Sequence, residues 1–203
     1  YYHPGFTGRS LSIQLLLRDV GVPYKVLPCT WDGDRVVACL QGYPVFAPPA
    51  IKKGDFVLAQ TNAILTYLGK KHGVAPSSDE DLAKCDQLSA DVSDVVSEVF
   101  KHGKDEDKGA AFLAPGGRLA SWLTHLDRCL GVCASGPFFF GENPTYADFN
   151  LLSLIDLLQF YFEDRFAPLV PENMTNWLGA AVCRNSYMAL QAEGLPILPD
   201  SFK

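Results

Sequence analysis

Residues 60–65, Gln-Thr-Asn-Ala-Ile-Leu, are the part of this chain best suited to hold a charged ligand. They predict the start of a helix with an apolar stripe that includes Ile64 and Leu68. A helix N-terminus presents free N–H groups and partial positive charge, which favour a bound carboxylate. The Gln60 amide and the Thr61 hydroxyl add directional hydrogen bonds. These residues predict an anion-binding site, unless they only cap the helix.

Residues 1–72 predict a small α/β unit that contains this helix. Residues 50–58 read as two short strands joined by a tight turn at Gly54-Asp55. The expected elements are strand 1–3, helix 8–20, strand 24–27, a short helix 34–42, the hairpin and helix 60–72. This β-α-β-α-β-β-α order is typical of an α/β arrangement.

The rest of the chain predicts a second domain built from helices. Residues 73–78 contain Gly and Pro and predict a linker, and the serines before Asp79 suit a helix start. Apolar spacing predicts helices over roughly 79–101, 110–131, 146–159, 173–184 and 186–192, with one short strand-like run at 138–140. We therefore expect domains at 1–72 and 79–203.

One local signal in the second domain is strong. Thr145-Tyr146-Ala147-Asp148 fits a capping box, in which the Asp148 side chain reaches back to the Thr145 N–H. The helix that follows is apolar over much of its surface and should be the buried centre of its domain. This motif is structural, and loss of the cap would cost about 1 kcal/mol.

Composition limits the classes of function. The 203-residue chain has a net charge of −6 and no basic stripe, so we expect no nucleic-acid partner. No window approaches the roughly 20 apolar residues of a membrane helix, and no signal peptide is visible. The six cysteines show neither zinc-ligand nor disulfide spacing, so we expect no metal and reduced thiols in a cytoplasmic protein. The chain begins without methionine, so we expect residues upstream.

These motifs together resemble a known family. Pro-Pro-Ala-Ile at 48–51, Gln-Thr-Asn-Ala-Ile-Leu at 60–65 and Thr-Tyr-Ala-Asp-Phe-Asn-Leu-Leu at 145–152 are similar to those of cytosolic glutathione transferases. The likeness covers nearly the whole chain and is to the tyrosine-type (sigma, pi, mu and alpha) members. It implies a thioredoxin-like domain followed by an all-α domain, which would carry the electrophile site and the contacts of a homodimer.

The resemblance implies roles for residues around glutathione, the expected co-substrate. Gln60 and Thr61 match the pair that holds the γ-glutamyl carboxylate. Asp91 falls where the family places an acid that reaches the γ-glutamyl amine of the neighbouring subunit's ligand. Trp31 and Arg35 lie in the segment that usually contacts the glycyl end.

The implied chemistry needs a thiolate. A free thiol has a pKa of about 8.5, and a hydroxyl that donates a hydrogen bond to the sulfur lowers it. Tyr2, followed by His and Pro, resembles the tyrosine donor of the family, and Arg9 resembles an arginine that adds positive potential near the sulfur. Other classes use Ser or Cys where this chain has Phe6. Tyr1 is the rival donor. Successive strand residues point to opposite faces, so only one of the two tyrosines can face the ligand, and we expect this to be Tyr2.

Two departures from the family pattern concern the loop around the ligand. Pro49 matches the family's cis-proline, but Pro48 replaces a residue whose N–H normally donates to the ligand. The Pro48 carbonyl can still accept a hydrogen bond, but one of the two backbone bonds must be lost or shifted. We therefore expect glutathione affinity to be weaker by about 0.5–1.5 kcal/mol. The loop from Tyr2 to Gly8 is also one residue longer than in the common animal classes.

The resemblance implies a transferase that conjugates the glutathione thiolate to small hydrophobic electrophiles, as in detoxification. Phe100, Tyr161 and Phe162 either line the electrophile pocket or pack in the core. Two alternatives keep the fold and change the function. One is a glutathione-dependent isomerase or peroxidase, similar to the prostaglandin isomerases. The other is a non-catalytic ligand carrier or crystallin-like protein.

Overall fold

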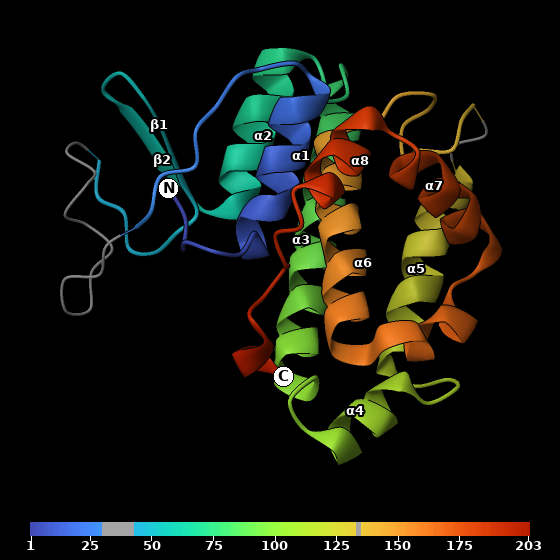
Figure 1. Ribbon diagram of the computed structural model, residues 1–203. Coiled ribbons are helices and arrows are strands. Elements are labelled where there is room, and N and C mark those ends of the chain that lie inside the picture. Colours follow the sequence, from blue (N-terminus) through green and yellow to red (C-terminus); the bar gives the residue numbers. More distant parts are fainter. Residues whose placement is uncertain (30–42, 133–134) are drawn as a thin grey trace.

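A computed structural model describes residues 1–29, 43–132 and 135–203 (Figure 1). The predicted helix 34–42 and the predicted ligand residues Trp31 and Arg35 lie outside these ranges. Within them, a small α/β half is followed by a half made of helices, as the sequence predicted. Among the described residues, no helix is both long and apolar enough to cross a bilayer.

The α/β half places two helices next to a β-hairpin. Its elements are a 3₁₀ turn Gly8–Ser10, α1 (Leu11–Asp19), β1 (Ala50–Lys53), β2 (Phe56–Ala59) and α2 (Thr61–His72). The strands β1 and β2 are antiparallel and pair Ala50 with Ala59. Figure 1 shows α1 and α2 packed side by side between the hairpin and the helical half. The hairpin therefore leads directly into the start of α2.

The predicted strands 1–3 and 24–27 are wrong as strands. The structure has a single parallel bridge there, between Tyr2 and Pro28. The Tyr2 N–H donates to the Leu27 carbonyl at 3.1 Å, and the Cys29 N–H donates to the Tyr2 carbonyl at 2.8 Å. Pro28 has no N–H to extend the ladder, and Val26 and Leu27 are exposed. The bridge nevertheless fixes Tyr2 beside the rest of the half.

The helical half contains α3 to α8 and two short 3₁₀ segments. The helices are α3 (Asp79–His102), α4 (Glu106–Leu113), α5 (Arg118–Val132), α6 (Tyr146–Phe162), α7 (Glu172–Val182) and α8 (Asn185–Ala192). The 3₁₀ segments are Glu163–Leu169 and Asp200–Phe202. In Figure 1, α3 and α6 run side by side, and these two helices pack along much of their length.

Two predictions for this half need correction. The helix expected over 110–131 is two helices, because Pro115 lacks an N–H and Gly116 adopts a positive φ of 74° between α4 and α5. The apolar run 138–140 is no strand, and only one bridge joins Phe138 to Gly141. Its aromatic rings enter the core instead: Phe138 and Phe139 are buried.

The predicted capping box and central helix are confirmed. The Asp148 carboxylate accepts the Thr145 N–H at 2.7 Å, and its other oxygen accepts Trp177 Nε1–H at 3.0 Å and the Phe139 N–H at 3.2 Å. Complete burial raises the pKa of Asp148, and these donors oppose that shift. Most residues of α6 are buried. The cap thus ties the start of α6 to both its preceding loop and α7.

One apolar core runs through both halves. It includes Leu15 of α1 and Ile64 of α2 together with Val92 of α3 and Leu154 of α6, all fully buried. A separate small cluster of Val45, Ala50 and Val57 lies under the hairpin. The start of α2 meets α3 and α6 at the edge of this core, and polar side chains of these three helices lie along that seam.

Candidate functional site

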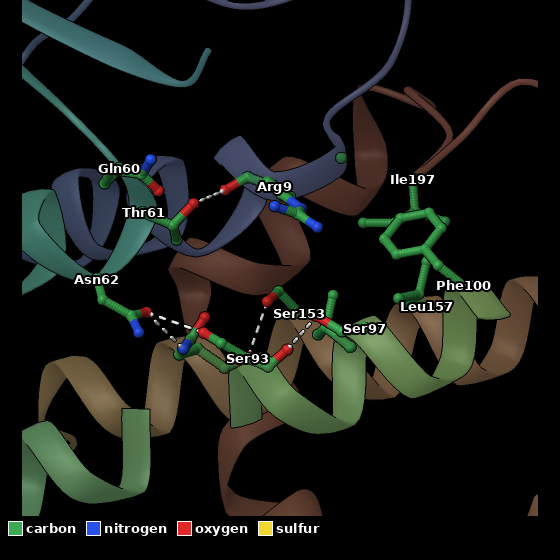
Figure 2. Close-up of a pocket in the computed structure, with 13 residues that line it drawn as sticks. Arg9, Gln60, Thr61, Asn62, Ser93, Ser97, Phe100, Ser153, Leu157 and Ile197 are labelled. Carbon is green, nitrogen blue, oxygen red and sulfur yellow. Dashed lines mark hydrogen bonds between the residues drawn. The ribbon is translucent and has the colours of Figure 1, made fainter. Parts of the chain in front are cut away.

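A pocket opens at the seam between the two halves (Figure 2). Its volume is about 190 Å³. The lining residues come from the loop before α1, the start of α2, the middle of α3 and α6, and the C-terminal segment: Gly8, Arg9, Gln60, Thr61, Asn62, Ser93, Val96, Ser97, Phe100, Asn150, Ser153, Leu157 and Ile197. The structure thus brings three of the predicted residues, Arg9, Gln60 and Thr61, to one cavity.

The start of α2 forms the polar end of the pocket. Gln60 has φ 73° and ψ 120°, an unusual conformation for a residue other than glycine, and turns the chain sharply into the helix. The first N–H groups of a helix have no partner within the helix, and in α2 no side chain caps them. The Thr61 hydroxyl donates to the Arg9 carbonyl at 3.3 Å. Gln60 and Thr61 therefore do not act as ordinary capping side chains.

Arg9 supplies the positive charge of the pocket. Its side chain is exposed, and its guanidinium lies 5.8 Å from the ring centre of Phe100. Figure 2 shows the Arg9 side chain extending toward Phe100. Among the described residues that line the pocket there is no carboxylate. Together with the open N-terminus of α2, this cation makes the pocket suited to an anionic ligand.

Tyr2 does not line this pocket but borders the separate cavity beneath the hairpin, and its hydroxyl meets the pocket wall at the backbone of Arg9. Its hydroxyl oxygen accepts the Arg9 N–H at 2.8 Å, and its ring is buried. Burial raises the pKa of Tyr2, although the Arg9 N–H and charge oppose that shift, so the hydroxyl keeps its proton at neutral pH. A β-carbon at Gly8 would overlap the hydroxyl, so Gly8 is the residue that separates Tyr2 from the pocket. Tyr1, by contrast, packs against the small cluster under the hairpin.

The other end of the pocket is apolar. Val96, Phe100, Leu157 and Ile197 line it. Ile197 is held there because the Thr7 and Gly8 N–H groups donate to the Pro196 and Ile197 carbonyls, at 2.9 and 2.8 Å. Of the three aromatic residues considered for this end, only Phe100 lines the pocket.

Tyr161 and Phe162 lie in the core instead. Both are buried, and the Tyr161 ring packs edge-on against Phe100 at 6.0 Å between ring centres. Tyr161 therefore supports the apolar end of the pocket through Phe100, whereas Phe162 packs against Phe112, and neither lines the pocket.

The remaining predicted residues lie away from this pocket. The Pro48–Pro49 peptide bond is cis, as expected, and Pro49 borders a separate cavity beneath the hairpin. Whether Pro48 weakens glutathione binding stays a prediction. Asp91 of α3 does not line the pocket, and its carboxylate lies 3.0 Å from His125 Nε2 of α5. No local sequence pattern predicts this pair, because the two residues are far apart in the chain.

Among the pocket residues that were not predicted, three polar ones lie close together: Asn62, Ser93 and Asn150. Ser93 Oγ donates to Asn62 Oδ1 at 3.1 Å, and Asn150 Nδ2 lies 3.4 Å from the same oxygen. Asn62 lies in the motif at 60–65 and Asn150 in the motif at 145–152, so the sequence already marked both segments. An amide between the apolar residues Phe149 and Leu151 of α6 is the feature that would have marked Asn150.

The described residues that line this pocket include no cysteine. Cys85, Cys129 and Cys183 are free thiols. Burial raises the pKa of Cys85 to about 11, which makes it a poor nucleophile. The described residues contain no group of three or more His, Cys, Asp or Glu side chains arranged to hold a metal ion.

Known proteins resemble the chain in sequence. Residues 90–177 match the family model described as "Glutathione S-transferase, C-terminal domain". A curated relative, glutathione S-transferase P 1 of Xenopus laevis, is 32% identical over 167 residues, which span 77% of this chain and 73% of the relative.

Solved structures resemble the fold. The pi-class glutathione S-transferase of Onchocerca volvulus superposes with a TM-score of 0.79 at 17% identity, covering 98% of this chain and 96% of that one. A structure titled prostaglandin synthase D of Nilaparvata lugens superposes with a TM-score of 0.75 at 18% identity, covering 96% and 97%. The fold is therefore a thioredoxin-like domain followed by an all-α domain.

Proposed function

The chain belongs to the glutathione transferase family, and we propose that it conjugates the thiolate of glutathione to small hydrophobic electrophiles. It is an enzyme of the glutathione S-transferase type. The observation that carries the proposal is the placement of the Tyr2 hydroxyl, which accepts the N–H of the pocket-lining residue Arg9 at 2.8 Å.

Tyr2 would act as the hydrogen-bond donor to the sulfur. Its oxygen already accepts one hydrogen bond, so its own proton is the group left to donate. Because the pKa of Tyr2 is raised, the residue stays a neutral donor at the pH at which the thiol must ionise. A donor and a nearby cation both favour the charged form of a thiol, so Tyr2 and Arg9 would lower the pKa of the sulfur.

The polar end of the pocket would hold the γ-glutamyl part of glutathione. The open N-terminus of α2, the Thr61 hydroxyl and the Gln60 amide are suited to a carboxylate. The loop at Pro48 and Pro49 and the segment containing Trp31 and Arg35 are proposed, on the family resemblance, to hold the rest of the tripeptide. Held in this way, the sulfur would lie ready for an electrophile bound in the same pocket, so a bimolecular reaction would become an effectively unimolecular one.

The apolar end would receive the electrophile. It is formed by four side chains, Val96, Phe100, Leu157 and Ile197, with Arg9 at its boundary. A small apolar molecule with one polarised group fits such a surface, because the apolar part is desolvated while the polarised group faces the cation.

The arrangement of domains and subunits is also a proposal. Residues 1–72 would form the glutathione-binding domain, 73–78 the linker and 79–203 the domain with the electrophile site and the dimer contacts. In a homodimer acting in cytoplasmic detoxification, Asp91 would reach the neighbouring subunit's ligand. His125 lies 3.0 Å from that carboxylate, so the two interactions would compete or be shared.

A titration of bound glutathione tests the proposal. The ultraviolet absorbance of the thiolate is followed against pH with the protein in excess, and conjugation is measured with a chloronitrobenzene. We expect the thiol pKa to fall below its free value of about 8.5 and conjugation to be measurable. A lowered pKa without conjugation would favour the isomerase or peroxidase alternative. Binding with an unchanged pKa would favour the carrier.

A further inference from the structure

Asn150 is a buried amide in α6, a helix whose residues are mostly buried. Only 4% of its surface is exposed. Its Nδ2 donates to Ser89 Oγ at 3.0 Å and to the Ser89 carbonyl at 3.1 Å, and lies 3.4 Å from Asn62 Oδ1. A buried amide without such partners would destabilise the core. The partners of Asn150 therefore explain how α6 tolerates it.

The same partners reach the first turn of α2. Asn62 Oδ1 accepts hydrogen bonds from Ser89 Oγ at 3.3 Å and from Ser93 Oγ at 3.1 Å, besides its contact with Asn150. Figure 2 shows Asn62 extending from α2 toward Ser93 on α3. Asn62 directly follows Thr61, so these bonds hold the turn that carries Gln60 and Thr61 against the helical half.

We propose that Asn150 and Asn62 are positioning residues for glutathione binding. The two side chains fix the first turn of α2 relative to Arg9, so that Gln60, Thr61 and the free N–H groups of the helix share one geometry. This inference rests on the proposed function, because it concerns the site that would hold the γ-glutamyl carboxylate. It makes the affinity of the α/β half for its ligand depend on a core residue of the helical half.

The test compares Asn150→Ala and Asn62→Ala with the parent protein by calorimetric titration of glutathione. We expect each variant to bind glutathione about three- to tenfold more weakly, the loss expected for one or two neutral hydrogen bonds. The double variant should lose less than the product of the two single losses, because both act through one network. At saturating glutathione, kcat should stay close to that of the parent, so the effect appears in KM.

Two controls separate positioning from general destabilisation. Asn173→Ala removes an amide that joins α7 to Asp127 of α5 through bonds of 3.1 and 3.4 Å, far from the pocket, and should leave glutathione affinity unchanged. The second control is 4-aminobutanoyl-cysteinyl-glycine, which lacks the γ-glutamyl carboxylate. Its affinity should be equal for the parent and for Asn150→Ala.

The outcomes distinguish the two proposals. If the parent binds glutathione and Asn150→Ala is folded but binds it equally well, the positioning role is wrong and the proposed function stands. Equal losses for glutathione and the shortened peptide would also overturn the positioning role. If Asn150→Ala fails to fold, the same comparisons on Asn62→Ala decide. A parent that does not bind glutathione would overturn the proposed function and this inference together.

Discussion

The backbone N–H of Arg9 donates a hydrogen bond to the hydroxyl oxygen of Tyr2 at 2.8 Å. The bond joins the N-terminal bridge to the loop that opens α1, seven residues apart in the chain. It leaves the proton of the Tyr2 hydroxyl as the donor and places that donor beside the cationic side chain of Arg9. A shift of either residue would therefore move the Tyr2 hydroxyl and the Arg9 guanidinium together.

Replacement of Tyr2 by phenylalanine should remove the donor and keep the ring. We expect kcat/KM with a chloronitrobenzene to fall about 10²–10³-fold, since this is the usual effect of losing one donor to a developing or stabilised anion. The pKa of bound glutathione should rise toward about 8.5. Tyr1→Phe is the matched control and should retain activity. If only Tyr1→Phe lost activity, Tyr1 rather than Tyr2 would be the hydrogen-bond donor to the sulfur.

Substitution of Gly8 by alanine should disturb the same hydroxyl from the backbone side. The new β-carbon would overlap the Tyr2 hydroxyl, and φ at Gly8 is +44°, a conformation that alanine avoids. We expect lower activity and a loss of stability of about 1–3 kcal/mol, measured by urea unfolding. Gly179→Ala is the control, because a β-carbon there meets no atom within 4 Å. Its stability should be unchanged or higher, and equal effects of the two substitutions would refute the prediction.

Replacement of Asp148 by alanine should be the most damaging change to the helical half. It leaves the N–H groups of Thr145 and Phe139 and the indole N–H of Trp177 without their acceptor. We expect a loss of about 3 kcal/mol, seen as a fall in Tm of about 6–12 °C in calorimetry. The exposed Asp107 offers a control, and its change to alanine should shift Tm by a small fraction of that. A small change for Asp148→Ala would mean that α6 needs no cap.

The Glu98 carboxylate should contribute a pH-dependent increment of stability. Partial burial tends to raise its pKa, but hydrogen bonds from Arg118 and Trp122 outweigh burial and lower it below its ordinary value of 4.5. A lowered folded-state pKa means that the stabilisation is present above pH 4.5 and is lost as the pH falls below it.

Comparison of the parent with Glu98→Gln by urea unfolding checks this. The parent should be more stable at pH 7 by less than about 1 kcal/mol, because Arg118 and Glu98 are partly exposed to solvent. The difference should shrink in acid. A difference that is the same at pH 7 and pH 3.5 would show that the pair contributes through packing alone.

Local patterns were predictable where neighbours in the chain decide the structure. The capping box at Thr145 and Asp148 and the start of α2 at Gln60 and Thr61 depend on residues within one helical turn. Elements that need partners were less predictable. The run 24–27 has strand-forming residues, but Pro28 and the exposed surface around it limit pairing to one bridge. The boundary between α4 and α5 was missed although Pro115 and Gly116 mark it in the sequence.

The site was predictable in part for the same reason. Arg9, Gln60 and Thr61 belong to short motifs, and all three line the pocket. The contacts of Asp91 with His125 and of Asn62 with Asn150 join residues 34 and 88 positions apart. No local pattern specifies such pairs, because they form only when α3, α5, α2 and α6 have packed.

The sequence by itself determined the α/β half followed by helices, the central position of α6 and the anion-favouring start of α2. These features follow from apolar spacing, capping and the free N–H groups of a helix, which act over a few residues. Only the tertiary structure decided that the Tyr2 hydroxyl meets the Arg9 N–H, that Ile197 closes the pocket and that a core amide of α6 reaches α2. Those relations depend on how the two halves share one core, and burial of that core places distant side chains side by side.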